Sequence, residues 1–471
     1  MIAVLRRRPW LALIAAMIVQ TVAFFVAQRD IAAADPLWYA VNAFRWATSP
    51  GDLFADNHPF VMRVGVTGPV ALAYRTAGVS LWTTDLLCLV ACLMILGVVY
   101  AAMETPRAKV LAMVIATAAA PLLARDAFML NPDLPSAAWM AVGVLCLSRR
   151  ERGPAWIALA VGAWFLAFLT KETAIWCVPV FAIAWVSDRF SRRYVPAIVT
   201  GLVLGAGYLI VCRLVWGDAL ARFHGIQHLD HTWSLHGRGA HAWLARLTWQ
   251  PIALLWQLLG FLIVPAVLSL RFASVRMRTW LVATWVFVLL YWFGSSTLSQ
   301  YSPLPLMFRM AYPLVPGLLI VSAATLDSLL DRTRVATIAF IGVLVVVPHA
   351  LRLVKLRGSR DEQAAFEKVL ATARTANRLT AVCGDPRCPG VADFYFGFAK
   401  PSNVSVVDET TFAPAPGDRV LVVVHKERAA EYKTTIGRRA QELGLPRVYE
   451  STHVSVYDAG DGAALAQALR R

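Results

Sequence analysis

Charged side chains are scarce in this sequence. Of its 471 residues, 16% are Asp, Glu, Lys or Arg, and 58% belong to the apolar set Ala, Val, Ile, Leu, Met, Phe, Trp, Tyr and Cys. Soluble domains carry roughly a quarter charged residues, and a soluble core of this length cannot bury so many apolar side chains. The composition excludes a disordered chain, a collagen, a coiled coil and a disulfide scaffold, and it indicates an integral membrane protein.

The sequence also lacks the motifs of several enzyme classes. It contains no Walker A motif, no G-x-S-x-G and no Rossmann G-x-G-x-x-G, so nothing supports an ATPase, a serine hydrolase or a dinucleotide-binding enzyme. Five histidines lie in the segment 216–250, but their spacing is not that of paired zinc ligands and H-E-x-x-H is absent. We interpret this segment as a solvated loop, and a divalent metal as cofactor stays open.

Apolar runs near the spanning length recur along the first three quarters of the chain. A membrane-spanning helix needs about 20 apolar residues, and we expect about eleven such helices, some of them short. They are expected at 9–27, 81–101, 109–124, 134–147, 155–170, 174–186, 195–215, 251–270, 279–293, 311–326 and 335–350.

Basic residues mark every second break between these runs. Lys and Arg collect in alternate breaks, as the positive-inside rule requires. The alternation predicts a multi-pass protein of a cell inner (plasma) membrane, with a cytoplasmic N-terminus and the C-terminus outside. Most of the net charge of +16 then faces the anionic inner leaflet, and no nucleic-acid partner is needed to explain it.

The composition changes after about residue 350. Amphipathic helices are predicted over 361–378 and 428–443, and strands over 380–383, 404–407, 420–425, 448–450 and 454–457. We therefore expect two domains, a transmembrane domain over 1–350 and a small periplasmic or extracellular α/β domain over 351–471. A domain outside the cytoplasm lies in an oxidising compartment, so Cys383 and Cys388 are expected to form a disulfide. The alternative is that the two thiols supply half of the ligands of a metal site.

Polar residues that could take part in catalysis or binding follow the first apolar run. Asp35 stands just past its outer end, near Tyr39, and is either a solvated loop charge or a general base. The same predicted outer loop contains His58 and Arg63.

Three further groups lie at the outer ends of later runs. Asp133 is either a helix-capping charge or a second functional carboxylate. Lys171 and Glu172 are either snorkelling ends or a charged pair at a membrane-embedded site. Arg309, close to Tyr312, has the planar fork that binds phosphate with two donors. All these groups share one side under a topology derived only from Lys and Arg, which favours a single site for an anionic, membrane-held donor.

These stretches, in this order, resemble the GT-C membrane glycosyltransferases, the superfamily of protein O-mannosyltransferases and aminoarabinose transferases, and especially its bacterial Rgt-like branch. The resemblance covers about residues 1–330. The matching stretches are Asp35-Pro-Leu-Trp-Tyr39, His58-Pro59-Phe60, Arg63-Val-Gly65, Pro69, Asn131-Pro132-Asp133-Leu-Pro135, Thr170-Lys171-Glu172-Thr173 and Phe308-Arg309-Met-Ala-Tyr312-Pro313.

The resemblance implies a polyprenyl-phosphate sugar donor and an inverting transfer to a hydroxyl of a glycan, lipid or protein acceptor on the outer face of the membrane. Asp35 matches the acidic residue that acts as base, and Asp133 the second acidic position. Arg63, Lys171 and Arg309 would bind the donor phosphate. Aminoarabinose-type members carry Glu-Lys where this chain has Met62-Arg63, so the resemblance does not extend to the aminoarabinose donor.

Other classes of protein remain as alternatives. A transporter or flippase of a lipid-linked saccharide would carry its charges in mid-helix, beside broken helices of paired repeats, and this sequence shows no repeat. An O-antigen ligase or polymerase would also work outside the membrane, and the long 216–250 segment permits one. A scaffold whose C-terminal domain only binds partners would need no site at all.

Overall fold

The chain folds into two compact units in a computed structural model that describes residues 7–31, 33–53, 58–127, 129–228, 239–272, 277–295, 306–307, 309–330 and 360–470. The first unit comprises Met1–Ala27, Ser49–Pro69 and Asp85–Arg357. The second comprises Gln28–Thr48, Val70–Thr84 and Gly358–Arg471. The second unit thus joins the C-terminal region to the two ends of the first outer loop, which the sequence predicts between the first two apolar runs.

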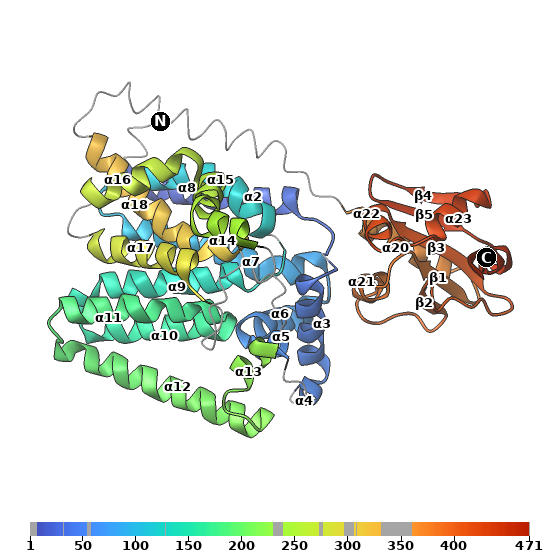
Figure 1. Ribbon diagram of the computed structural model, residues 1–471, viewed down its shortest axis with the longest axis horizontal. Coiled ribbons are helices and arrows are strands. Elements are labelled where there is room, and N and C mark those ends of the chain that lie inside the picture. The colour runs from blue at the N-terminus through green and yellow to red at the C-terminus, as the bar shows by residue number, and fades with distance from the viewer. Residues whose placement is uncertain are drawn as a thin grey trace. The chain divides into compact units, whose positions relative to one another are not determined.

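The first unit is helical (Figure 1). Nearly every helix consists mainly of apolar residues, and short 3-10 turns join several of them. Helices α6 and α7 are shared between the two units. In chain order, the elements of this unit are α2 (Trp10–Ala27), α4 (Pro50–Leu53), α5 (Pro59–Met62), α6 (Val64–Ala77), α7 (Leu81–Ala102), α8 (Pro106–Ala127), α9 (Asp133–Ser148), η1 (Arg150–Arg152), α10 (Pro154–Thr170), η2 (Glu172–Trp176), α11 (Cys177–Ser187), η3 (Arg192–Tyr194), α12 (Val195–Trp216), α13 (Ala221–His228), α14 (Gly239–Leu247), α15 (Trp249–Leu259), η4 (Gly260–Leu262), α16 (Ile263–Phe272), α17 (Arg278–Phe293), η6 (Arg309–Leu314) and α18 (Val315–Leu330).

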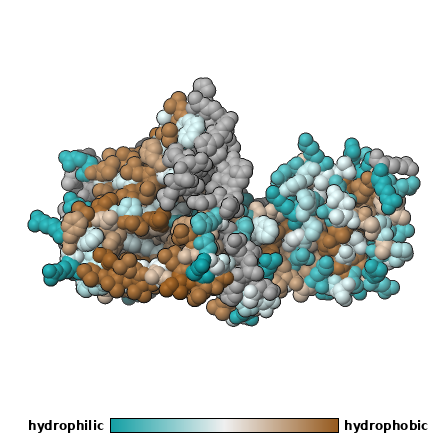
Figure 2. Space-filling view, turned by 60° about the horizontal axis from the view of Figure 1, so that its bottom comes forward, coloured by the Kyte–Doolittle hydropathy of each residue, from teal (hydrophilic) through white to brown (hydrophobic). Residues whose placement is uncertain are grey.

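Four stretches within the described residues are long and apolar enough to cross a membrane: Trp10–Ala27, Leu81–Ala102, Arg192–Trp216 and Arg309–Leu329. Apolar side chains cover much of the helical unit on the face shown in Figure 2. On α12, Leu214 is 78% exposed, a surface that suits contact with lipid rather than water. The mostly helical membrane fold is confirmed, whereas the count of about eleven spans remains a prediction.

The expected single helix over 251–270 is wrong. The structure has two helices there, α15 and α16, separated by η4. Gly260 lies between them with a φ of 55°, a positive value that residues with a Cβ rarely adopt and that glycine adopts without strain. The sequence pattern missed the break because both halves are equally apolar. The run expected at 335–350 lies outside the described residues.

Helices α9 and α10 form a tight pair within the first unit. A Cβ added to Gly143 would lie 2.1 Å from the indole nitrogen of Trp164, and that nitrogen donates a hydrogen bond to the Met140 carbonyl at 3.2 Å. Ser136 also donates to the Ala167 carbonyl at 3.2 Å. The two helices therefore have a fixed offset, which places the first residue of α9 beside the end of α10.

The second unit is built around a five-stranded sheet with the order β2-β1-β3-β5-β4. Strand β1 pairs in parallel with β2 and β3, whereas β5 pairs antiparallel with β3 and β4. The elements of this unit are α3 (Asp35–Thr48), α20 (Asp361–Ala373), β1 (Leu379–Cys383), α21 (Cys388–Tyr395), β2 (Val404–Asp408), β3 (Arg419–His425), α22 (Lys426–Glu431), α23 (Ile436–Glu442), β4 (Arg447–Glu450), β5 (Val454–Asp458) and α24 (Ala463–Arg470).

Both faces of this sheet are covered. Alternate residues of a strand point to opposite faces, and Leu421 and Val423 of β3 pack with Phe366 of α20 on one face. Val422 and its neighbours pack with Ile436 of α23 on the other. Burial on both sides explains why β1 and β3 read as continuous apolar runs in the sequence.

All five strands predicted from the sequence are present. The predicted helix over 428–443 is wrong in detail, because two short helices, α22 and α23, replace it. Lys433 lies between them with a φ of 54°, and the carboxylate of Glu409 accepts hydrogen bonds from the first backbone amides of α23. A cap supplied from a distant loop leaves no local signal in the sequence.

Candidate functional site

A buried ion pair joins α9 to the end of α10. The ammonium of Lys171 donates to the carboxylate of Asp133, and the two residues are only 6% and 2% exposed. Lys171 Nζ also lies 3.0 Å from Met310 Sδ. A pair so far from solvent is held in one geometry, because leaving either charge unpaired in a low dielectric costs several kcal/mol, on the order of 3–5.

Local backbone structure puts both charges in place. Lys171 is the residue at which α10 ends: its φ of −155° and ψ of 145° are extended, and its amide still donates to Ala167 at 2.8 Å. Asp133 is the first residue of α9, where the helix dipole favours a carboxylate. The side-chain oxygen of Asn131 accepts from the amides of Asp133 and Leu134 at 3.1 and 3.2 Å, so Asn131 performs the capping and leaves the Asp133 carboxylate for Lys171.

Glu172 lies between two guanidinium groups. Arg63 donates to both of its carboxylate oxygens, at 3.2 and 2.9 Å, and Arg222 Nε donates to Oε1 at 2.7 Å. Arg222 is fully buried, and its guanidinium lies over the ring of Phe168 at 4.7 Å. Among the residues that the structure describes, the two Nη atoms of Arg222 have no hydrogen-bond partner.

A close backbone approach brings Arg63 to this position. A Cβ on Gly65 would lie 2.4 Å from Thr170 Oγ1 and 2.8 Å from the Thr170 amide nitrogen. Only glycine therefore lets the start of α6 lie directly against the end of α10. The glycine two residues after Arg63 thus allows the close approach that brings Arg63 to Glu172, two residues after Thr170.

Arg309 belongs to the same cluster. It begins η6, which packs on α9, and its charge and that of Arg63 both act on the Lys171 ammonium. Tyr312, in the same turn, is buried. The structure thus gathers Arg63, Lys171, Arg222 and Arg309 around two carboxylates, those of Asp133 and Glu172, and leaves an excess of positive charge at the ends of buried helices.

An apolar groove reaches this cluster. It has a volume of about 420 Å³ and runs between α10, α11 and α12, lined almost entirely by apolar side chains. Phe168, Tyr208 and Phe223 belong to its lining, and Phe168 is the ring that carries the Arg222 guanidinium. A lipid chain in the groove would therefore have a cation at one end.

The remaining residues expected at the site lie elsewhere in the chain. Asp35 and Tyr39 are on α3 of the second unit, where Asp35 is the partly buried first residue and Tyr39 is fully buried. His58 is exposed in the first unit; its ring stacks on Phe60, over which the Arg63 guanidinium lies at 5.8 Å.

Sequence reasoning missed Arg222. A single arginine just after an apolar run looks like an ordinary solvated helix end. The solvated loop expected over 216–250 is wrong where the structure describes this segment, because α13 and α14 lie there. No local signal in the sequence marks this residue, because its contact with Glu172 joins positions 50 residues apart. Among the described residues no group of three His, Cys, Asp or Glu side chains is arranged to hold a metal ion.

Comparison with protein-family models finds no match, and no curated protein matches the sequence. Solved structures do match. The crystal structure of ArnT from Cupriavidus metallidurans in the apo state has a TM-score of 0.61 at 15% identity, over 97% of this chain and 98% of that one. The structure of the same protein bound to undecaprenyl phosphate has a TM-score of 0.59 at 15% identity and the same coverage. The GT-C resemblance drawn from the motifs is therefore confirmed at the level of the fold.

Proposed function

We propose that this chain is a membrane glycosyltransferase that moves a sugar from a polyprenyl-phosphate donor to an acceptor hydroxyl, with inversion, on the outer face of a bacterial inner membrane. One observation carries the proposal: a cluster of four cations and two carboxylates, half of them buried and the others partly buried, lies at the ends of membrane helices, beside an apolar groove. The ArnT-like fold supports it, since one of the matching ArnT structures contains undecaprenyl phosphate.

The cations act on the leaving group. As the bond between the anomeric carbon and the phosphate oxygen breaks, negative charge grows on the polyprenyl phosphate, and preorganised cations stabilise it best in a site that excludes water. Arg63 and Arg222 share the carboxylate of Glu172, and Lys171 pairs with Asp133, so these five side chains alone carry one more positive than negative charge. The charge of Arg309 adds to the positive field at Lys171. The apolar groove beside Phe168 accommodates part of the isoprenoid chain.

Asp35 acts as the base. Its carboxylate accepts the proton of the acceptor hydroxyl as that oxygen attacks the anomeric carbon, and the phosphate leaves as an anion without needing a general acid. Asp133 positions Lys171 rather than the acceptor, because its carboxylate is already engaged by that ammonium. The base thus acts on the attacking hydroxyl, and the cations act on the leaving phosphate of the same displacement.

The disulfide between Cys383 and Cys388 supports the expected topology. Disulfides persist in oxidising compartments such as the bacterial periplasm, which agrees with an outward C-terminal domain and a cytoplasmic N-terminus. The acceptor is then a glycan, a lipid or a protein of the cell envelope.

Transfer assays on the purified protein test this function. Polyprenyl-phosphate sugars are supplied as a panel, and mass spectrometry of envelope glycans with and without the gene identifies the sugar to use. Asp35→Asn should lose at least a hundredfold in kcat while undecaprenyl phosphate still binds, and Asp461→Asn is the matched control on an exposed loop. Wild-type turnover in Asp35→Asn would exclude its role as base.

Arg222→Leu tests the cation cluster. It should weaken binding of undecaprenyl phosphate at least tenfold, whereas Arg213→Leu, at an exposed position near the end of α12, should not. Equal affinity in both variants would remove Arg222 from the donor site.

A further inference from the structure

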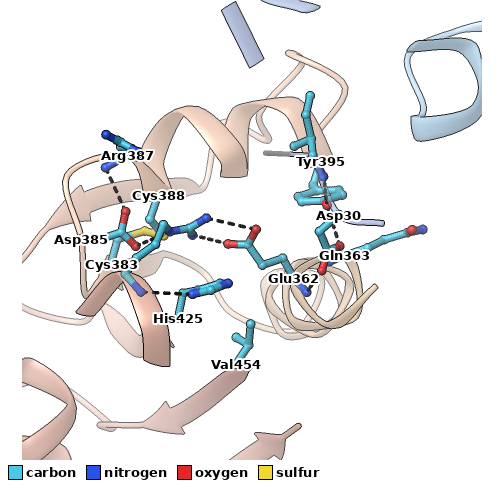
Figure 3. A network of polar contacts seen from close by, with 12 residues as sticks. Asp30, Glu362, Gln363, Cys383, Asp385, Arg387, Cys388, Tyr395, His425 and Val454 are labelled. Carbon is cyan, nitrogen blue, oxygen red and sulfur yellow. Dashed lines mark hydrogen bonds and ion pairs between the residues drawn. A yellow bond between two sulfur atoms is a disulfide. The ribbon is translucent and has the colours of Figure 1, made fainter. Parts of the chain in front are cut away.

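A residue of the first outer loop caps a helix of the C-terminal region. The Asp30 carboxylate accepts hydrogen bonds from the amides of Glu362 and Gln363, at 2.8 and 3.0 Å (Figure 3). These amides open α20, and the residue before that helix, Arg360, supplies no side-chain cap of its own. A helix start with unsatisfied amides is costly when buried, so Asp30 completes α20 from more than three hundred residues away.

Tyr395 fixes the same carboxylate from a second helix. Its hydroxyl lies 2.7 Å from Asp30 Oδ1 and accepts from the Ile31 amide at 3.2 Å. Arg360 adds a hydrogen bond to the buried side chain of Gln28 at 2.7 Å. Burial raises the pKa of Asp30, and the hydrogen bonds from Glu362, Tyr395 and Gln363 oppose that rise. The loop and the domain therefore satisfy each other's buried polar groups.

The helix that follows, α3, packs on α21 through one face. Leu37, Ala40 and Phe44 recur at helical spacing on that face. Ala40 belongs to the core that contains α20 and α21, and the ring of Phe44 stacks on Phe398 at 4.7 Å. A Cβ on Gly390 would come within 3.3 Å of Leu37. This face of α3 is therefore covered by protein.

The two elements that hold the loop are themselves cross-linked. Arg428 donates to the buried carboxylate of Glu362 on α20 and, at 3.1 Å, to that of Asp385. Asp385 lies between Cys383 and Cys388, whose disulfide ties the end of β1 to the first residue of α21. Displacing α21 or the start of α20 would break this network.

Asp35 lies within the segment that is held at both sides. Asp30 is fixed five residues before it, and α3, which begins at Asp35, is fixed on α21. Given the proposed function, we infer that the C-terminal domain is a positioning device for the catalytic base: it holds Gln28–Thr48 in the conformation in which the Asp35 carboxylate reaches the acceptor hydroxyl. Asp30 and Tyr395 are then positioning residues of the transfer reaction, and the domain does more than recruit an acceptor.

Substitution of Asp30 in the full-length protein tests this inference. Asp30→Ala removes the cap and should lower kcat at least tenfold, while the affinity for undecaprenyl phosphate stays within twofold. Asp30→Asn, which still caps a helix through its amide oxygen, should recover most of that loss, and Tyr395→Phe should cost several-fold. Glu409→Ala removes a comparable distant cap from α23 and is the matched control.

Hydrogen exchange gives a readout that is independent of activity. Amides of α3 should exchange at least tenfold faster in Asp30→Ala than in the wild type or in Glu409→Ala. If Asp30→Ala showed faster exchange but the kcat of the wild type, the inference would be overturned. Unchanged exchange in Asp30→Ala would overturn it too, and either result would leave the proposed function standing. If Asp35→Asn kept its turnover, the proposed base would be wrong, a result that the Asp30 variants do not influence.

Discussion

Arg63 holds Glu172 with two parallel hydrogen bonds, from Nε to Oε1 and from Nη2 to Oε2. Bidentate pairs of this kind are among the stronger charge-assisted contacts in proteins. The same carboxylate also accepts from Arg222, so one negative charge separates two positive ones. Glu172 therefore acts as the electrostatic centre of the cluster.

Glu172→Gln should destabilise the helical unit. The substitution leaves the buried charge of Arg222 opposite that of Arg63 without compensation, and breaking such a pair costs about 3–5 kcal/mol. Thermal unfolding in detergent should show a lower midpoint than for Glu151→Gln, an exposed control. Adding Arg222→Met should restore much of the midpoint, because both buried charges are then gone; a double variant no better than Glu172→Gln would contradict this account.

Gly65→Ala should disturb the site through the backbone. The new Cβ meets Thr170 at 2.4 Å, and because the Thr170 amide is also within 2.8 Å, no side-chain rotation removes the clash. We expect α6 to move away from α10, with at least a tenfold loss of undecaprenyl phosphate affinity as Arg63 leaves Glu172. Binding assays should show no such loss for Gly68→Ala on the same helix, where a Cβ meets nothing within 4 Å. Equal binding by the two variants would exclude the steric role of Gly65.

The sequence predicts the apolar helices and all five strands because each is marked locally by its own pattern of apolar residues. It does not predict Gly260 as a break, since glycine is common inside membrane helices and only the packing decides its φ of 55°. The sequence also predicts the disulfide between Cys383 and Cys388, which the structure confirms.

Contacts over long sequence separations are less accessible to pattern reasoning. Asp30 caps α20 and Arg222 reaches Glu172 only after folding. Neither residue differs locally from an ordinary solvated charge at a helix end. The order of the motifs indicates Arg63, Lys171 and Arg309 as site residues. The charges that surround them, such as the carboxylates paired with Arg63 and Lys171, are evident only in the tertiary structure.

Replacing both members of the Asp133–Lys171 pair should separate stability from activity. Lys171→Met alone leaves a buried carboxylate unpaired and should lower the unfolding midpoint, whereas Asp133→Asn with Lys171→Met should recover it. Transfer activity should stay at least a hundredfold down in the double variant if Lys171 stabilises the leaving phosphate. The double variant Arg107→Met with Asp327→Asn removes another ion pair of the first unit and should retain activity. Full activity without Lys171 would reduce the pair to a structural contact.

Glu362 and His425 give the second unit opposite responses to pH. Burial raises the pKa of Glu362 from 4.5 to about 7, aided by the charges of Asp30 and Asp385 and opposed by Arg428. Burial lowers the pKa of His425 from 6.5 to about 4, with the charge of Arg428 acting in the same direction. The Arg428 side chain donates to Glu362, and the Arg428 amide donates to His425 Nδ1 at 3.4 Å, so both groups belong to the network that holds the first outer loop.

Because these two pKa shifts have opposite signs, the stability of the second unit should be independent of pH over a limited range. The stabilisation linked to Glu362 is present below pH 4.5 and is lost as pH rises to about 7, whereas that linked to His425 is present above pH 6.5 and is lost as pH falls to about 4. Between pH 4.5 and 6.5 the two slopes cancel. Glu362→Gln should therefore gain stability with rising pH up to 6.5, and His425→Gln should lose stability from pH 4.5 to 7, by about 3 kcal/mol at most. Hydrogen exchange of the β1 and β3 amides in the full-length protein, corrected for intrinsic rates, measures both slopes, and pH profiles that match the wild type in both variants would show that neither group titrates as its burial requires.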